Sequence, residues 1–191
     1  MGEKIKLGIA LCGSYCTYEK VFEALESLKD EYELIPIMSE NASETDSRFG
    51  TAYEHKKELR RLSGREPVCS IRDAEPLGPK EPLDLILIAP CTGNTLAKLS
   101  HGITDTAVLM AAKAHMRNGR PLLIALSTND GLMGSAENIA RLLNRKNVYF
   151  VPFGQDAPDK KPYSLQADFS RLKESIDEAL KGRQIQPILR K

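Results

Sequence analysis

Short apolar runs alternate with amphipathic stretches along nearly the whole chain, and this alternation constrains the fold more than any other feature of the sequence. An apolar run of about four to eight residues is typical of a buried strand, whereas apolar residues three and four positions apart are typical of a helix packed on a core. Strands that alternate with helices predict a parallel sheet, because a helix returns the chain to the same edge. The expected strands occupy residues 5–12, 32–38, 83–89, 121–127 and 148–153.

The run at residues 83–89, LDLILIA, is the most hydrophobic in the chain. It lacks the strict alternation of a strand with one face in water, so it is expected at the centre of the sheet with both faces buried. In residues 5–12, larger apolar side chains alternate with Gly8 and Ala10, which predicts a close neighbour on the face with small residues. These patterns predict an α/β fold, a doubly wound parallel sheet in a three-layer sandwich with helices on both faces.

The segments between the strands predict helices, loops and one further strand. Helical spacing of apolar residues occurs at 21–28, 49–62, 96–100, 105–116 and 165–180. The inner stripe of 49–62 would be Phe49, Ala52, Leu59 and Leu62, and that of 165–180 would be Leu165, Phe169, Leu172, Ile176 and Ala179. Ser135 is the expected N-cap of another helix. We expect a polar loop at 39–47, a short strand at 67–71 and an extended, proline-rich surface loop at 76–82.

The length of 191 residues suits one hydrophobic core. No linker rich in Pro, Gly or Ser divides the chain, so residues 1–181 are predicted to form a single domain. The tail at 182–191 is expected to fray or to pack on a neighbour. The N-terminus lacks the regions of a signal peptide, which predicts a cytoplasmic protein.

The charge balance excludes a function that depends mainly on electrostatic attraction. Lys and Arg number 27 and Asp and Glu number 26, which gives a net charge of +1 and argues against nucleic acid or an acidic membrane as the partner. The four cysteines have no zinc-site spacing and predict free, mostly buried thiols. The three histidines are scattered, so no metal site is expected: His55 is expected on the surface, His101 at a helix end and His115 on a helix.

Ligands of open parallel sheets bind beyond the carboxyl ends of the strands, so the residues that follow each run are the informative ones. These segments are rich in hydroxyls, amides and glycine and carry no Lys or Arg, which favours a phosphorylated cofactor or mononucleotide held by backbone N–H groups and hydroxyls. Candidate cofactor-binding residues are Gly13, Ser14, Ser39, Pro90, Thr92, Asn94, Thr95 and Ser127, and Asn94 and Asn129 are the candidate catalytic residues. Cys91 is the cysteine expected to contact a ligand.

Structural explanations compete with these assignments. Gly13 and Ser14 suit a plain turn and helix cap, and Ser39 suits an ordinary loop serine. The polar loop at 90–95 is harder to explain as a connector, because it follows the most buried strand. The fingerprint G-x-G-x-x-G is absent after the first strand, which argues against a dinucleotide on this chain.

The segment Pro90-Cys91-Thr92-Gly93-Asn94-Thr95 resembles the Pro-Ala-Ser-Ala-Asn-Thr motif of the flavoprotein family that includes flavin-dependent cysteine decarboxylases. As in that family, a helix, Gly102 and Asp105 follow. Other positions of the family pattern also match this sequence, at Gly13-Ser14, at Ser39, and at Asn129 with Met133. The resemblance spans about residues 4–180. It implies a flavodoxin-like sandwich that binds FMN and forms trimers or larger assemblies of trimers.

Within the family, residues 48–52 and 73–80 resemble a branch in which the chain is half of a two-subunit oxidoreductase that acts on a small dicarboxylate. The resemblance implies that the partner subunit carries the nicotinamide fold and NADP. Arg48, Lys98 or Arg117 would bind the substrate carboxylates. Two alternatives stay open: a flavin-dependent decarboxylase, although residues 68–83 lack the expected histidine, or a non-catalytic partner subunit that has lost its flavin.

Overall fold

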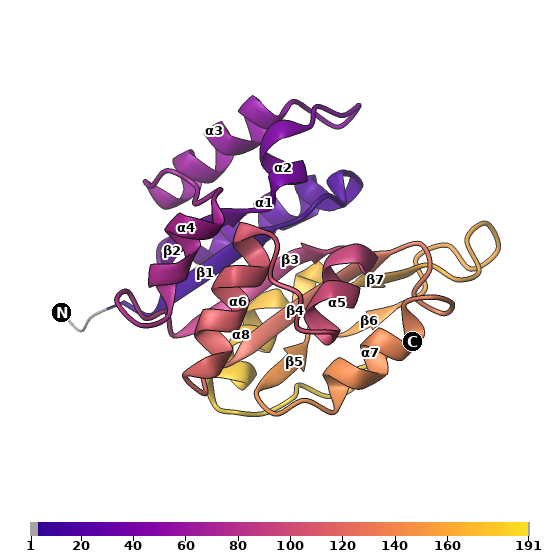
Figure 1. The fold of residues 1–191 in the computed structure, drawn as a ribbon. Coiled ribbons are helices and arrows are strands. Elements are labelled where there is room, and N and C mark those ends of the chain that lie inside the picture. The colour runs from indigo at the N-terminus through magenta and orange to yellow at the C-terminus, as the bar shows by residue number, and fades with distance from the viewer. Residues whose placement is uncertain (1–3, 191) are drawn as a thin grey trace.

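The computed structural model describes residues 4–190, in which seven strands form one sheet with helices on both sides (Figure 1). The strands are β1 (Lys6–Leu11), β2 (Glu33–Met38), β3 (Leu85–Cys91), β4 (Leu122–Thr128), β5 (Val148–Phe150), β6 (Phe153–Gly154) and β7 (Leu165–Ala167). The helices are α1 (Tyr18–Leu28), α2 (Glu40–Glu44), α3 (Ala52–Ser63), α4 (Ile71–Ala74), α5 (Gly93–Ser100), α6 (Ala107–Arg117), α7 (Ala136–Leu143) and α8 (Leu172–Leu180), with 3-10 helices η1 (Tyr15–Thr17), η2 (Glu75–Leu77) and η3 (Phe169–Arg171).

The strands run in the order β2-β1-β3-β4-β7-β6, and β5 also pairs with β4. Strands β1 to β5 pair with one another in parallel, as the alternation of strands and helices predicts. Strand β5 pairs with the first half of β4, and β7 pairs antiparallel with its end. The sheet is therefore a mixed version of the predicted doubly wound fold.

Strand β3 is buried on both faces, as its composition predicts. Leu85, Leu87 and Ala89 enter one apolar cluster, and Ile86 and Ile88 enter the other. Helices α1, α3 and α8 contribute to the first cluster and α5, α6 and α7 to the second. Each leucine or isoleucine buried in this way contributes about 1.5–3 kcal/mol, so β3 anchors both layers.

The close neighbour predicted beside the small residues of the first strand is present. A Cβ added to Gly8 would lie 2.7 Å from Cδ1 of Leu83 and 3.0 Å from Cγ1 of Ile86. A side chain at this position would displace the residues that pack against β1.

The C-terminal part of the chain departs from the predicted elements. Residues 148–153 form two strands rather than one, because Pro152 lies between β5 and β6 and has no N–H for a ladder. The helix predicted over 165–180 begins only at Leu172, because residues 165–167 pair with β4 and β6. Asp168 ends that strand by accepting a hydrogen bond from the N–H of Ser170.

Three shorter segments also differ from the expectations. The expected loop at 39–47 contains α2, capped by the Ser39 hydroxyl, which accepts from the N–H of Ala42. Of the expected strand at 67–71 only Val68 pairs, in an isolated bridge. In the expected loop at 76–82, Pro76 is the second residue of the 3-10 helix η2, where its missing N–H is not needed.

Helix α3 begins three residues after Phe49. Thr51 and Glu54 form a capping box that fixes this start, and Phe49 is 45% exposed instead of facing inward. His55 is 5% exposed rather than on the surface, because its ring packs against Tyr18 with the centroids 4.6 Å apart. The charged residues beside His55 in the sequence had indicated a surface position instead.

The tail from residue 182 packs on the sheet instead of fraying. Gln184 bonds both backbone groups of Phe150, and the N–H of Phe153 donates to the carbonyl of Ile188 at 3.0 Å. Residues 1–3 and Lys191 lie outside the described residues, so the expected absence of a leader falls on a part that the structure does not describe. No described helix is both long and apolar enough to cross a membrane.

His115 is fully buried on α6. Its Nε2–H donates to the carbonyl of Pro121 at 2.8 Å, and its Nδ1 has no partner among the described residues. Burial lowers the pKa of His115 to about 4, because a second proton would sit in an apolar site without an acceptor.

We expect acidification to lower the free energy of unfolding through His115. Between pH 4 and about 6.5, the unfolded chain binds a proton that the folded chain excludes, so stability falls as the pH is lowered through this range, by up to about 3 kcal/mol. Urea denaturation at a series of pH values measures the slope. His115→Gln should reduce it, and an unchanged slope in this variant contradicts the assignment.

Candidate functional site

Four loops, which follow β1, β2, β3 and β4 and are numbered in that order, meet at the carboxyl edge of the sheet and enclose two neighbouring cavities. The larger, of about 560 Å³, is lined by residues that include Gly13, Ser14, Ser127 and Asn129. The smaller, of about 280 Å³, is lined by residues that include Gly13, Ser39, Thr92, Asn94 and Thr95. Gly13 borders both cavities. The topology thus brings the sequence candidates together, except Pro90, which is buried in β3 and lines neither cavity.

The first loop is tied to its neighbours on both sides. The Ser14 hydroxyl donates to the carbonyl of Ser127 at 2.8 Å, and the Tyr15 hydroxyl donates to the carbonyl of Asn41 at 2.7 Å. Ser14 makes no capping bond to the following turn, so the explanation as a helix cap does not apply to it. These two bonds connect three of the four loops into one wall.

The third loop leads directly into α5. The Thr92 hydroxyl caps this helix by accepting from the N–H of Thr95 at 3.1 Å and donates to the Thr95 hydroxyl at 3.0 Å. The first N–H groups of such a helix have no partner within it, which leaves donors for an anion. The Asn94 side chain is exposed and makes no hydrogen bond to the described residues, so its amide is available to a ligand.

Cys91 does not occupy the position expected of a ligand contact. It is 0% exposed and lies within β3, where it lines neither cavity. Burial raises the pKa of the Cys91 thiol well above its usual range. Burial also raises the pKa of Cys12 to about 11, an effect opposed by hydrogen bonds with Thr95 and Thr92. Both thiols are therefore neutral at pH 7. All four cysteines are free, as predicted, but Cys16 is exposed.

A hydrogen-bond cluster that the sequence did not reveal holds the fourth loop. Asp130 accepts from the hydroxyls of Thr128 and Ser135. The Thr128 bond is the main cause that lowers the pKa of Asp130. Ser135 precedes α7, as the N-cap pattern predicts, but its hydroxyl bonds Asp130 rather than the helix. Gly93 packs closely against all three polar side chains.

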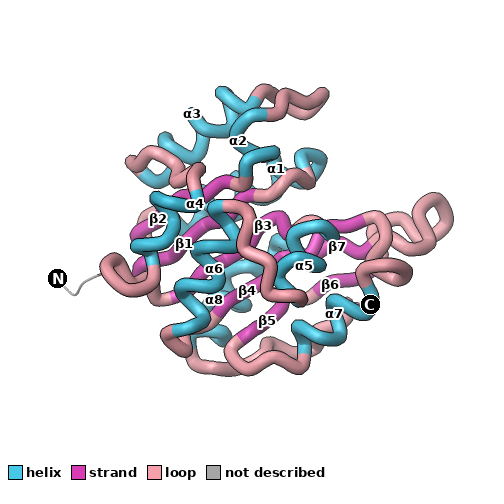
Figure 2. Tube along the Cα trace, in the orientation of Figure 1, coloured by secondary structure: helices cyan, strands magenta, loops and turns pink. Residues whose placement is uncertain are grey.

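Two cations border the larger cavity. Arg48 comes from the segment before α3, and Lys161 comes from the loop between β6 and β7, which projects from the body of the molecule (Figure 2). Nζ of Lys161 lies 3.8 Å from Oδ2 of Asp156. Lys161 was missed because the loop that carries it does not directly follow a parallel strand.

The other cations proposed from the sequence lie elsewhere. Lys98 borders the smaller cavity and forms an ion pair of 2.6 Å with Asp105. Arg117 lines a separate pocket beside α6. Among residues 4–190, no group of His, Cys, Asp and Glu could hold a metal ion, and neither cavity is lined by a described histidine.

The comparisons with known proteins agree with this geometry. The family model "Flavoprotein" matches residues 1–169. The chain belongs to the flavoprotein family. It is 48% identical over 185 residues to the B subunit of dipicolinate synthase from Bacillus subtilis (strain 168), a match that covers 96% of this chain and 92% of the relative.

Solved structures give the same relationship. The crystal structure of the dipicolinate synthase B subunit from Bacillus halodurans C has a TM-score of 0.90 and 42% identity, over 98% of this chain and 96% of that one. The dodecameric FMN-dependent UbiX-like decarboxylase from Escherichia coli O157:H7 has a TM-score of 0.64 and 21% identity, over 78% of this chain and 80% of that one. The second likeness shows the fold alone, and it confirms the flavodoxin-like sandwich of this flavoprotein.

Replacing Gly93 with Ala is expected to destabilise the protein by about 1–3 kcal/mol, the range of overpacked cores. The new Cβ would lie 2.7 Å from Oγ1 of Thr128, 2.8 Å from Oγ of Ser135 and 3.0 Å from Oδ1 of Asp130. Urea denaturation measures the change. Gly13→Ala is the matched control, because its Cβ would meet nothing closer than the Tyr15 ring at 3.9 Å. Equal stability of both variants would contradict the close packing of the two loops.

Proposed function

We propose that the two cavities together bind FMN. A ligand pocket of a few hundred Å³ with convergent polar groups suits a cofactor of this size. The proposal is supported by the hydroxyls and amides that line both cavities and by membership of the flavoprotein family. The residues that would hold the phosphate are Gly13, Ser14 and Ser39, and those that would bond the ribityl chain or the ring are Thr92, Asn94, Thr95 and Ser127.

The donors in these cavities suit a phosphate without a dedicated cation. In the smaller cavity Lys98 is neutralised by Asp105, and the donors that remain are hydroxyls, the amides of Asn41 and Asn94 and the N–H groups at the start of α5; Glu40 is the other acidic side chain of this lining. Pro90 would act indirectly, by fixing the backbone before Thr92. Gly13 leaves the boundary between the cavities without a side chain, which gives a long cofactor room to span both.

We further propose that the protein is the B subunit of dipicolinate synthase and forms dipicolinate from dihydrodipicolinate. Bound FMN would supply an acceptor for the hydride that leaves the substrate. The chain's own residues would orient the substrate: Arg48 and Lys161 pair with its two carboxylates, and Asn129 and Asn94 donate hydrogen bonds from opposite cavities. The observation that carries this proposal is the placement of two cations and one amide around the larger cavity, with a second amide in the cavity beside it, in a chain so similar to that enzyme component.

A motif that this chain lacks indicates which of the two subunits binds the nicotinamide cofactor. It has no dinucleotide fingerprint, so we propose that the A subunit of dipicolinate synthase carries NADP and that activity requires both chains. We propose the cytoplasm of the mother cell of a sporulating bacterium as the location.

Two apolar side chains are exposed on the loop after β4: Leu132 is 50% exposed and Met133 is 57% exposed. Exposed apolar side chains of this kind suit burial between copies of the chain, which supports our proposal of a trimer or an assembly of trimers.

FMN binding is expected to respond to substitutions that leave the fold intact. Gly13→Ala places a methyl group between the cavities and should weaken binding by roughly tenfold or more, whereas its stability should stay close to that of the parent. Asn94→Ala should weaken binding and abolish turnover, because it removes an exposed amide without unfolding the helix. Quenching of flavin fluorescence during titration with FMN measures both.

Asn118→Ala is the control, because it removes an exposed amide at the C-terminal end of α6 that lines neither cavity. A parent protein that binds no FMN but still associates with the A subunit would contradict the proposal and favour the non-catalytic partner. Near-normal turnover of Asn94→Ala with bound flavin would refute the role of that residue.

Substrate binding is expected to depend on the two cations of the larger cavity. Arg48→Gln and Lys161→Gln should each raise the KM for dihydrodipicolinate by roughly tenfold, since a hydrogen bond to a charged group contributes about 1.5–3 kcal/mol. Formation of dipicolinate by the two-subunit enzyme, followed by absorbance, measures this. Lys160→Gln is the control, because Lys160 adjoins Lys161 in sequence but lines neither cavity. Release of carbon dioxide from a cysteinyl substrate would instead favour the decarboxylase alternative.

A further inference from the structure

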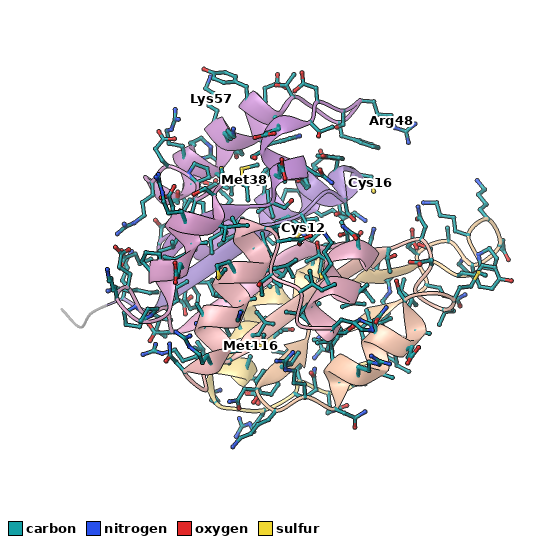
Figure 3. The ribbon with its side chains drawn as sticks, in the orientation of Figure 1. Cys12, Cys16, Met38, Arg48, Lys57 and Met116 are labelled. Carbon is teal, nitrogen blue, oxygen red and sulfur yellow. The ribbon has the colours of Figure 1, made fainter. Side chains whose placement is uncertain are left out.

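A third hollow, of about 340 Å³, lies beside α6 and is bordered by the segment after α5 and the turn after α7. Its apolar lining comes from Leu99, Ile103, Leu109 and Met116. Leu109 also lines the smaller cofactor cavity, so its side chain separates the two spaces. Met116 and Arg48 lie in distant parts of the molecule (Figure 3), so this hollow is distinct from the larger cavity.

Four cations surround this apolar lining: Lys113, Arg117, Arg145 and Lys146. All four residues are exposed, and none forms an ion pair with an acidic side chain of the described residues. The lining of the hollow contains no Asp or Glu, although the chain as a whole has a net charge of only +1. The hollow therefore concentrates positive charge that no neighbouring acidic side chain of the lining neutralises.

This arrangement is unfavourable without a ligand. Lys113 and Arg117 are four residues apart on α6, and like charges at this spacing destabilise a helix by a few tenths of a kcal/mol. The backbone carbonyl of Leu99 accepts only a long bond of 3.4 Å from Arg145 and leaves that guanidinium with free donors. Guanidinium groups and ammonium groups in such a ring suit carboxylate or phosphate oxygens.

We propose that this hollow is a binding site for a small anion that has an apolar body and at least two carboxylate or phosphate groups. The apolar lining would accept the body, and the four cations would hold the charged groups at the rim. The volume falls within the range of small-molecule sites, which favours a small ligand over an extended acidic segment of a partner protein. The site is separate from the proposed flavin cavities and does not depend on the function proposed for them.

The experiment uses the full chain and dipicolinate as the probe, because dipicolinate is a planar ring that carries two carboxylates. Binding is measured by isothermal titration calorimetry in a background of Arg48→Gln and Lys161→Gln, which removes the cations of the larger cavity. The background protein should still bind the probe. Adding Lys113→Gln and Arg117→Gln should weaken binding by roughly tenfold or more. Malonate, which has two carboxylates and no ring, should bind more weakly than dipicolinate.

Lys57→Gln with Lys80→Gln removes the same charge at exposed positions outside the hollow and serves as the matched control. The proposal is overturned if the background protein does not bind, if the control weakens binding equally, or if malonate and dipicolinate bind alike. Circular dichroism verifies that each variant is folded. Lys146→Gln removes a cation of the hollow that lies outside α6, and it should also weaken binding of the probe. A change in oligomeric state caused by the hollow variants, measured by size-exclusion chromatography with light scattering, would assign the surface to an interface between copies and would also overturn the proposal.

Discussion

Burial of β3 on both faces is the constraint on which the rest of the structure depends. Its alternate side chains enter two separate apolar clusters, so neither layer of helices can move without exposing part of this strand. Because the strand is parallel to β1 and β4, all three end at the same edge of the sheet. The loops that follow these ends are therefore held together by the core, and the cavities form where they meet.

The polar contacts at this edge add order that the core alone does not provide. Bonds from Ser14 to the fourth loop and from Tyr15 to the second loop hold the first loop in position. Asp130 and its two hydroxyl partners occupy the space beside Gly93, so the third and fourth loops approach each other closely. The side chains that line the cavities are thereby fixed by neighbouring groups of the protein, which favours binding because little order must be gained.

The same fold separates two kinds of charged surface. The flavin cavities have nearly balanced charge, with Lys98 paired to Asp105, and they offer mainly hydroxyls and amides. The hollow beside α6 has cations without acidic partners among the described residues, arranged around an apolar lining. Leu109 is the boundary between the smaller flavin cavity and this hollow, so one helix of the family fold contributes to both surfaces.

The sequence by itself determined the parallel core, the central place of β3 and the four loops that carry the candidate residues, because hydrophobic periodicity reports which faces are buried. It did not determine that residues 165–167 pair as a strand, that His55 is buried, that Cys91 lies outside the cavities, or that Lys161 and Arg48 line the same cavity. Those features depend on contacts between segments far apart in the chain. Only the tertiary structure decided them, since local spacing carries no information about which distant side chains share a space.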